Sequence, residues 1–271
     1  MTDRAISPDI PMPAQDAEAL ALRHARIVKF AGITISFALL IAGWVVLSWH
    51  VRPWVPSPTE TWNAALRLVQ TPKFYDDLLL TWQRLLVAFF AATIFGGVLG
   101  LAVGLSKRIE AFFQPLLALA LAVPDPVFII FAILALGTGE VAGSVALVLA
   151  IAPFVTNIVR TSVQARDMTL DEMVKIYRLS PQTAFRACLL PQLVPSLVTA
   201  ARLSFALSWK IVILVEALAQ PHGIGAAIYH AFNTLRMRDV FALAILFTIM
   251  MQIVERGVLA QIEKRVLRWR Q

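Results

Sequence analysis

The stretch 85–106, with the sequence LLVAFFAATIFGGVLGLAVGLS, decides the class of fold because it contains no Asp, Glu, Lys or Arg. A helix needs about 20 mostly apolar residues to cross the hydrocarbon core of a bilayer. Residues 30–51, with the sequence FAGITISFALLIAGWVVLSWHV, form a second stretch without these charged side chains. Both stretches are therefore predicted to be membrane-spanning helices.

The composition of the whole chain also indicates a membrane protein. Of its 271 residues, 59% are hydrophobic and 15% are charged, whereas a soluble domain averages about half apolar and a quarter charged residues. Residues 1–26 are polar and acidic and include Pro8, Pro11 and Pro13, so we predict a disordered cytoplasmic tail there. Residues 27–271 are predicted to form a single transmembrane domain.

Further apolar stretches complete the pattern of an all-α integral membrane protein. We predict six spans, at 30–51, 82–106, 112–136, 141–160, 193–218 and 240–260. The third span must kink or break at Val123-Pro124-Asp125-Pro126, because each proline removes a backbone donor and crowds the preceding turn.

The Lys and Arg residues indicate how the chain is oriented in the membrane. Most of them lie before the first span, after the second, between the fourth and fifth, and after the sixth. Because cytoplasmic loops carry an excess of positive charge, both termini are predicted to lie on the cytoplasmic side of the inner membrane, with lipid around the spans. We predict no nucleic-acid partner despite the net charge of +7, because the basic residues form no stripe with interleaved aromatic side chains.

Several classes of site are not expected in this chain. Cys188 is the single cysteine, and the four histidines have no spacing typical of metal ligands, so we predict no metal site. No Gly-Lys pair occurs, and a phosphate-binding P-loop is therefore absent from the sequence. We predict no enzymatic activity, no ATP hydrolysis and no bound cofactor for the chain itself.

The loop 161–192 between the fourth and fifth spans has the pattern of two short helices. Thr169 and Glu172 have the spacing of a capping box, which predicts a helix from about residue 170. Ser180-Pro181 supplies a second N-cap followed by proline at the first helical position, so a second helix should begin there and end near Leu190. The turn between them is predicted at Arg178.

This loop resembles the cytoplasmic EAA loop of the permeases of ABC importers, with Glu172, a turn six residues later and Leu190-Pro191 in order. In detail the chain is similar to the nitrate, sulfonate and taurine branch of that family. The order and spacing of the shared motifs carry the resemblance. They are Val55-Pro56-Ser57-Pro58, Arg84, Gly96-Gly97, Pro124-Asp125-Pro126, Pro195, Ala201-Arg202-Leu203, Trp209, and Glu216 before Gly223-Ile224-Gly225.

The resemblance implies the permease subunit of an ATP-driven importer for a small anion such as nitrate, a sulfonate or taurine. It implies three kinds of protein partner: ABC subunits that bind ATP, a solute-binding protein outside the membrane, and a second permease subunit, in a homodimer or else a heterodimer. The loop would be the coupling helix that contacts the ATPase. The residues expected in this contact are Thr169, Asp171, Glu172, Arg178, Ser180, Pro181, Leu190 and Pro191.

One residue of the loop departs from the family pattern. Arg178 stands where the family has glycine, which adopts a left-handed conformation freely. A residue with a Cβ costs about 1 kcal/mol in that conformation. The sequence therefore leaves open whether the turn keeps its shape, and it raises the hypothesis of an unusual ATPase or permease partner.

Charged and polar residues inside the predicted spans have two interpretations. They line a pathway for the solute, or they form structural pairs within the protein. The residues in question are Asp125, Arg202, Trp209, Lys210 and Glu216. Arg84, near the start of the second span, is interpreted as an anchor at the outer interface.

The same charges keep a different class of transporter open. A self-sufficient secondary transporter or channel would use intramembrane charges, but it leaves the capped pair of helices in the loop unexplained. The Gly-x-x-x-Gly spacings at Gly96, Gly100 and Gly104 predict close helix packing, within the subunit or across a dimer.

Overall fold

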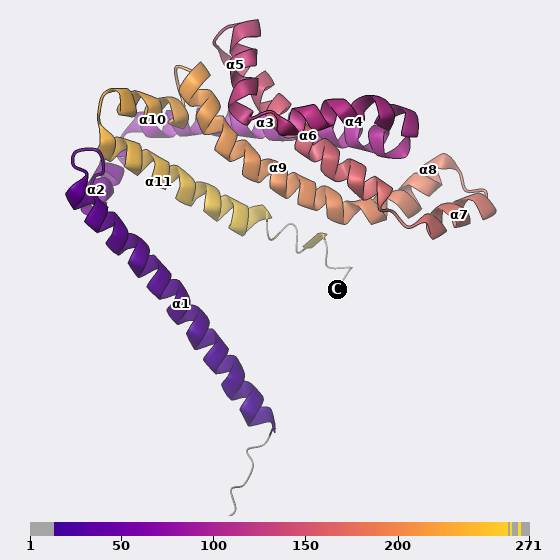
Figure 1. The fold of residues 1–271 in the computed structure, drawn as a ribbon, viewed down its shortest axis with the longest axis horizontal. Helices are drawn as coiled ribbons and strands as arrows, with labels where there is room; N and C mark the ends of the chain where they lie inside the picture. The colour runs from indigo at the N-terminus through magenta and orange to yellow at the C-terminus, as the bar shows by residue number, and fades with distance from the viewer. Residues whose placement is uncertain (1–13, 260, 262–264, 267–271) are drawn as a thin grey trace, which may run out of the picture. The chain divides into compact units, whose positions relative to one another are not determined.

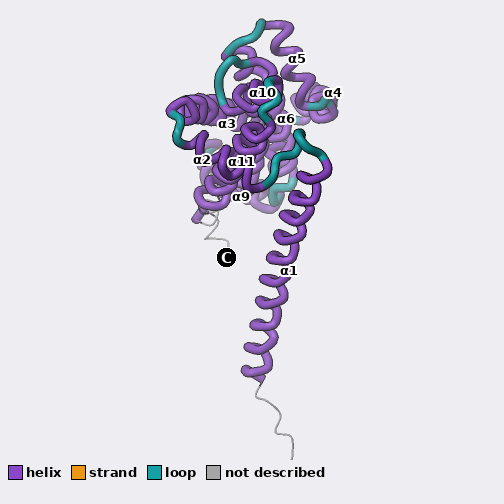
Figure 2. Tube along the Cα trace, turned by 90° about the vertical axis from the view of Figure 1, so that its left-hand side faces the viewer, coloured by secondary structure: helices purple, strands orange, loops and turns teal. Residues whose placement is uncertain are grey.

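The computed structural model describes residues 14–259, 261 and 265–266, and all of their regular structure is helical (Figure 2). The chain divides into two compact units, Met1–Glu60 and Thr61–Gln271. The first contains α1 (Ala14–His50), which includes one helix segment long and apolar enough to cross a membrane, Val28–His50.

Helix α1 corrects the prediction for the N-terminal tail. Residues 14–26, predicted to be disordered, belong to α1. Their sequence, AQDAEALALRHAR, is rich in Ala and Leu, which are strong helix formers, and this local propensity outweighs the polar composition. Residues 1–13 lie outside the described part of the chain.

Helix α2 (Pro58–Val69) begins in the first unit with a capping box. Ser57 N–H donates to Glu60 Oε2 at 3.0 Å, and Glu60 N–H donates to Ser57 Oγ at 3.2 Å. These reciprocal bonds satisfy two donors that a helix start leaves without intrahelical partners.

The second unit is a bundle of helices around α3, α6 and α9 (Figure 1). Its helices run in the order α3 (Pro72–Leu105), α4 (Lys107–Ala122), α5 (Asp125–Leu136), α6 (Glu140–Gln164), α7 (Met168–Ile176), α8 (Pro181–Thr183), the π-helix η1 (Ala184–Leu189), α9 (Leu190–Ala219), α10 (Ile224–Asn233), α11 (Met237–Val254) and the π-helix η2 (Glu255–Leu259). Short helices α7 and α8 lie at one end of this bundle and α10 at the other (Figure 1).

The all-α membrane fold is confirmed, and one of the six predicted spans is a bent pair of helices. The described residues contain five helices long and apolar enough to cross a membrane, and α4 with α5 forms a further pair bent by 102°. The bend lies at Val123-Pro124, where the sequence predicted a break. Residues 112–136 are thus not one straight helix, because Pro124 and Pro126 cannot donate the backbone bonds that would continue α4.

The start of the fifth span also differs from the prediction. Helical structure runs without interruption from Pro181 to Ala219, so the second loop helix does not end at Leu190 but continues into α9. The π-helical turn at Ala184–Leu189 precedes Pro191, whose missing N–H would break a regular helix. A wider turn at this point lets the helix pass the proline.

Three glycines bring α3 close to α6. A Cβ on Gly96 would lie 2.7 Å from the carbonyl oxygen of Ala152, and one on Gly100 would lie 2.7 Å from that of Thr156. A Cβ on Gly104 would lie 2.7 Å from Cβ of Val163. The close packing predicted for this motif is therefore made within the subunit.

Candidate functional site

The loop that carries the candidate ATPase contact begins with a cap different from the predicted one. Helix α7 starts at Met168, and Asp167 Oδ1 accepts from the Thr169 N–H at 2.8 Å and the Thr169 hydroxyl at 2.7 Å. Thr169 is thus inside the helix, and the predicted capping box of Thr169 with Glu172 is wrong. The side-chain and backbone hydrogen bonds from Thr169 hold the pKa of the Asp167 carboxyl below its usual value.

The other loop residues are placed as follows. Glu172 is exposed on α7, and the side chain of Asp171 lies outside the described part of the structure. Ser180 Oγ accepts from the Thr183 N–H at 3.2 Å, with Pro181 directly after it, which confirms the second predicted cap. Leu190 and Pro191 lie in the first turn of α9 and are exposed.

The turn at Arg178 keeps the shape that glycine would give it. Arg178 has φ of 50°, in the left-handed region. Tyr177 N–H donates to the carbonyl of Met173 at 2.9 Å, which is the last regular helical bond, and Leu179 N–H donates to the carbonyl of Val174 at 3.1 Å. The bond from Leu179 to Val174, which spans the left-handed residue, is the 6→1 bond of a Schellman motif. The question that the sequence left open is answered, because Arg178 adopts the conformation despite its Cβ.

Apolar side chains around this turn are exposed to an unusual degree. Ile176 is 76% exposed and Tyr177 69%, and Met173, Leu179 and Phe185 are exposed as well. We call these five residues the loop patch. A cluster of exposed apolar side chains outside the membrane spans is typical of a protein contact surface.

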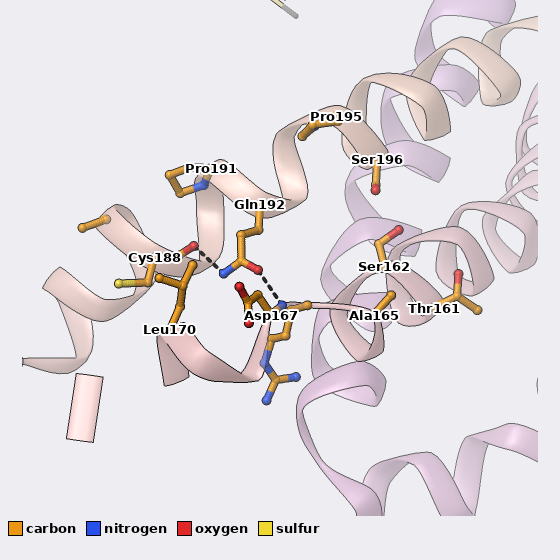
Figure 3. A pocket seen from close by; sticks show the side chains of 12 residues that line it. Thr161, Ser162, Ala165, Asp167, Leu170, Cys188, Pro191, Gln192, Pro195 and Ser196 are labelled. Carbon is orange, nitrogen blue, oxygen red and sulfur yellow. Dashed lines mark hydrogen bonds between the residues drawn. The ribbon is translucent and has the colours of Figure 1, made fainter. Parts of the chain in front are cut away.

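Gln192 connects the loop to the transmembrane helices beneath it (Figure 3). Its Oε1 accepts from the Asp167 N–H at 2.8 Å, and its Nε2 donates to the Cys188 carbonyl at 2.9 Å. These bonds cross one wall of a cavity of about 700 Å³ between the end of α6, the start of α7 and the start of α9. The start of α7 is thereby tied to the helix that continues through the bundle.

A buried ion-pair network occupies the other half of the bundle. Glu216 of α9 is 0% exposed and Arg84 of α3 is 8% exposed, with 2.7 Å between Arg84 Nη1 and Glu216 Oε1. The Thr81 hydroxyl lies 2.9 Å from Glu216 Oε2, which also accepts from the Gly225 N–H at 2.9 Å. Arg84 donates further to the His222 carbonyl at 2.6 Å and, through Nε and Nη2, to Glu140 at the start of α6.

The same network caps the N-terminus of α10. Gly223 N–H donates to Asp77 Oδ1 at 3.0 Å, and Ile224 N–H donates to the Thr81 hydroxyl at 2.9 Å. Together with the bond from Gly225 to Glu216, three donors at the helix start find oxygen partners on α3 and α9, and carboxylates are favoured at this positive end of the helix dipole.

Glycine is required beside this carboxylate. Gly223 has φ of 116°, and a Cβ there would collide with the Glu216 carboxylate. The motif that carried the family resemblance, Glu216 before Gly223-Ile224-Gly225, is therefore a packing and capping unit.

The structure separates the residues predicted for the pathway. The contacts of Glu216 are those of structural pairing, and Arg84, interpreted as an interface anchor, is buried, so that interpretation is wrong. Lys210 is exposed and lies 5.6 Å from the ring centroid of Trp209, which packs against Phe247. Arg202 and Asp125 are half-buried on α9 and at the start of α5. In the described part of the chain, no ion pair joins Asp125 or Lys210 to Glu216.

Functional residues missed by the sequence reasoning share one property. Thr81, Asp77, Glu140 and Gln192 each act through a partner distant in sequence, so no local motif marks them. Among the described residues, no group of three or more His, Cys, Asp or Glu side chains could hold a metal ion.

Comparison with protein families gives the assignment. The family model described as "binding-protein-dependent transport system inner membrane component" matches residues 85–268, which include the bent helix pair α4–α5, the loop, Glu140 and Glu216. The chain belongs to this family. It is the permease subunit of an ABC importer, a multi-pass protein of the inner membrane and a transporter component, and its family implies ATPase and binding-protein partners.

Relatives with similar sequences include three named permeases. Nitrate import permease protein NrtB of Synechocystis sp. is 26% identical over 219 residues, covering 76% of this chain and 78% of NrtB. Putative aliphatic sulfonates transport permease protein SsuC of Bacillus subtilis is 24% identical over 272 residues, covering 96% and 95%. Taurine transport system permease protein TauC of Escherichia coli is 24% identical over 240 residues, covering 85% and 86%.

Two solved structures share the fold of the permease. An amino acid ABC transporter crystallised with histidines has a chain with a TM-score of 0.62 at 20% identity, covering 74% of this chain and 97% of that one. The MetNI methionine ABC transporter in an inward-facing conformation gives a TM-score of 0.57 at 20% identity, covering 68% and 93%.

Proposed function

We propose that this permease imports a small anion such as nitrate, a sulfonate or taurine. The names of its relatives NrtB, SsuC and TauC support this solute class. Two permease subunits, in a homodimer or else a heterodimer, would form the pathway, and a soluble binding protein would deliver the solute on the outer side. ATP would be bound and hydrolysed by the partner ATPase, and both termini of the permease would lie in the cytoplasm.

The observation that supports coupling is the continuity between the loop and the bundle. The loop patch offers an apolar surface to an ATPase. Helical structure from Pro181 to Ala219 runs from the base of this loop to Glu216, and Gln192 ties α7 to the same helix. When the ATPase closes on ATP, it would move the loop, and the packed helix would carry that displacement to the network at the far end.

Co-purification tests the proposed function. The tagged chain is solubilised from its native membrane as wild type and as Glu172→Ala and Tyr177→Ala variants, and bound proteins are identified by mass spectrometry. Tyr229→Ala is the matched control, because Tyr229 is an exposed tyrosine on α10, at the other end of the bundle.

We expect wild type and Tyr229→Ala to retain an ATPase and the loop variants to retain at least tenfold less. A chain that purifies alone and transports without an ATPase would instead support a self-sufficient secondary transporter.

A further inference from the structure

Arg84 pairs with its two carboxylate partners in different ways. The fully buried Glu216 receives the Nη1 side of the guanidinium, together with the His222 carbonyl. Glu140 receives the other edge, with Nε donating to Oε2 at 2.8 Å and Nη2 donating to Oε1. Two parallel N–H groups directed at two oxygens on one atom are the geometry by which arginine binds oxyanions. This edge of Arg84 therefore has the geometry of an oxyanion-binding site, and the Glu140 carboxylate is bound there.

Exposure makes Glu140 an exchangeable occupant. Its side chain is 62% exposed, although the guanidinium that it contacts is 8% exposed. In a membrane-spanning chain, an exposed carboxylate faces water or another subunit, because contact with lipid is unfavourable for a charge. An ion pair whose carboxylate reaches solvent is weakened, because water screens that charge and can replace its hydrogen bonds. An anion arriving from that side can therefore compete with Glu140 for Arg84.

We propose that the Nε and Nη2 edge of Arg84 is an oxyanion-binding site of the pathway, and that Glu140 is an internal occupant which the anionic group of the solute replaces. Arg84 stays in place during the exchange because Glu216 and the His222 carbonyl hold its Nη1 at 2.7 and 2.6 Å.

The geometry of the site selects a chemical class of ligand. It fits an anion that presents two oxygens bonded to one atom, as nitrate, carboxylates and sulfonates do, and it fits a halide less well, because one atom cannot lie in line with two parallel N–H groups. The pathway role of the site rests on the proposed function, whereas oxyanion binding at Arg84 is independent of it.

Anion titration of the full-length chain tests the site. Wild type and Glu140→Gln are purified in a detergent with sugar headgroups, which carries no phosphate. Sodium nitrate and sodium methanesulfonate are the probes and sodium chloride is the reference, at constant ionic strength. The readout is the rise in unfolding temperature with anion concentration, since a ligand that binds the native state stabilises it. Glu110→Gln is the matched control, because Glu110 pairs with Arg160 at 3.1 Å near the loop end of the bundle.

Removal of the internal carboxylate should improve binding. We expect the half-saturating concentration of nitrate or methanesulfonate to fall at least threefold in Glu140→Gln, with no change in Glu110→Gln and none for chloride. A second variant, Glu140→Ala, should give the same fall, because it also lacks the carboxylate. It controls for a glutamine amide that remains hydrogen-bonded to Arg84. The proposal is overturned if both Glu140 variants titrate as wild type does, if chloride acts as strongly, or if Glu110→Gln shows an equal gain.

Failure here is distinguishable from failure of the proposed function. If wild type and the Glu140 variants give the same titration curves, and wild type retains its ATPase in the co-purification, the oxyanion site alone is overturned. A wild-type chain that retains no ATPase would overturn the importer assignment, while the titrations still decide whether Arg84 binds an oxyanion.

Discussion

The Gln192 side chain accepts a hydrogen bond from the Asp167 backbone N–H at 2.8 Å, across 25 residues of sequence. Asp167 is the cap of α7, and Gln192 lies in the first turn of α9 (Figure 3). The bond therefore connects the junction of α6 and α7 to the helix that continues into the membrane. This contact favours movement of the loop and α9 as one body.

Gln192→Ala should loosen the start of α7 without unfolding the bundle. A hydrogen bond of this type contributes about 1 kcal/mol, which corresponds to roughly fivefold faster local opening. Hydrogen exchange of the peptide that contains residues 167–177 measures the effect. The control is Gln182→Ala, since Gln182 is exposed on α8. Equal exchange rates in the two variants would show that Gln192 does not hold the loop.

Replacement of Arg178 by glycine should stabilise the loop. Arg178 occupies the left-handed region at a cost of about 1 kcal/mol, which glycine does not incur, so the local free energy of unfolding should rise by about 0.5–1 kcal/mol. Arg186→Gly is the opposite control, because Arg186 lies within η1, where glycine is unfavourable by about 1 kcal/mol. Hydrogen exchange of residues 170–190 measures both, and a loss of stability in Arg178→Gly would contradict the strain argument.

The sequence predicted those features that depend on local spacing. The uncharged stretch 85–106 lies within α3 except for its last residue, the Pro124 break lies between α4 and α5, and Ser180 caps the helix that Pro181 begins. Each of these rests on residues within a few positions of one another. The α7 cap was misplaced because Asp167 and Thr169 are both suitable cap residues two positions apart, and only the fold shows that Asp167 accepts the bonds.

The Arg84 network could not be predicted in the same way. Its partners Glu140 and Glu216 lie 56 and 132 residues away, and a lone arginine beside Trp82 has the pattern of an interface anchor. Glu216 before Gly223-Ile224-Gly225 was noticed as a motif, but its physical reason needs the position of Thr81 and the close approach of α10. Long-range pairing of charges inside a membrane domain leaves no periodic signal in one sequence.

The glycines of α3 give a prediction with an internal control. Gly100→Ala places a Cβ 2.7 Å from the carbonyl oxygen of Thr156, so α3 and α6 must move apart, at a cost of about 1–3 kcal/mol. Gly97→Ala meets no atom within 4 Å and should be neutral or more stable by up to about 1 kcal/mol, because alanine favours helix. Unfolding by titrated denaturant in detergent micelles measures the difference. Equal stability of the two variants would mean that the α3–α6 contact is looser than these distances.

A comparison of two fully buried threonines distinguishes the contribution of the Glu216 network to stability from the contribution of burial alone. Both hydroxyls lie at 2.8–2.9 Å from a carbonyl of their own helix, that of Asp77 for Thr81 and that of Ala152 for Thr156. The Thr81 hydroxyl in addition lies 2.9 Å from Glu216 Oε2 and accepts from the Ile224 N–H. Thr81→Val leaves a buried carboxylate oxygen and a buried N–H with fewer partners, so it should cost about 2–4 kcal/mol.

Thr156→Val removes only a local bond within a helix and should cost less than about 1 kcal/mol. Thermal unfolding of both variants in the same detergent, followed by co-purification of the ATPase, checks the comparison. We expect Thr81→Val to retain its ATPase while it folds, because the loop patch is at the other end of the bundle. Equal losses of stability in the two variants would show that Thr81 contributes through packing and not through the cap of α10, and the network would then be held by Arg84 and Glu216 alone.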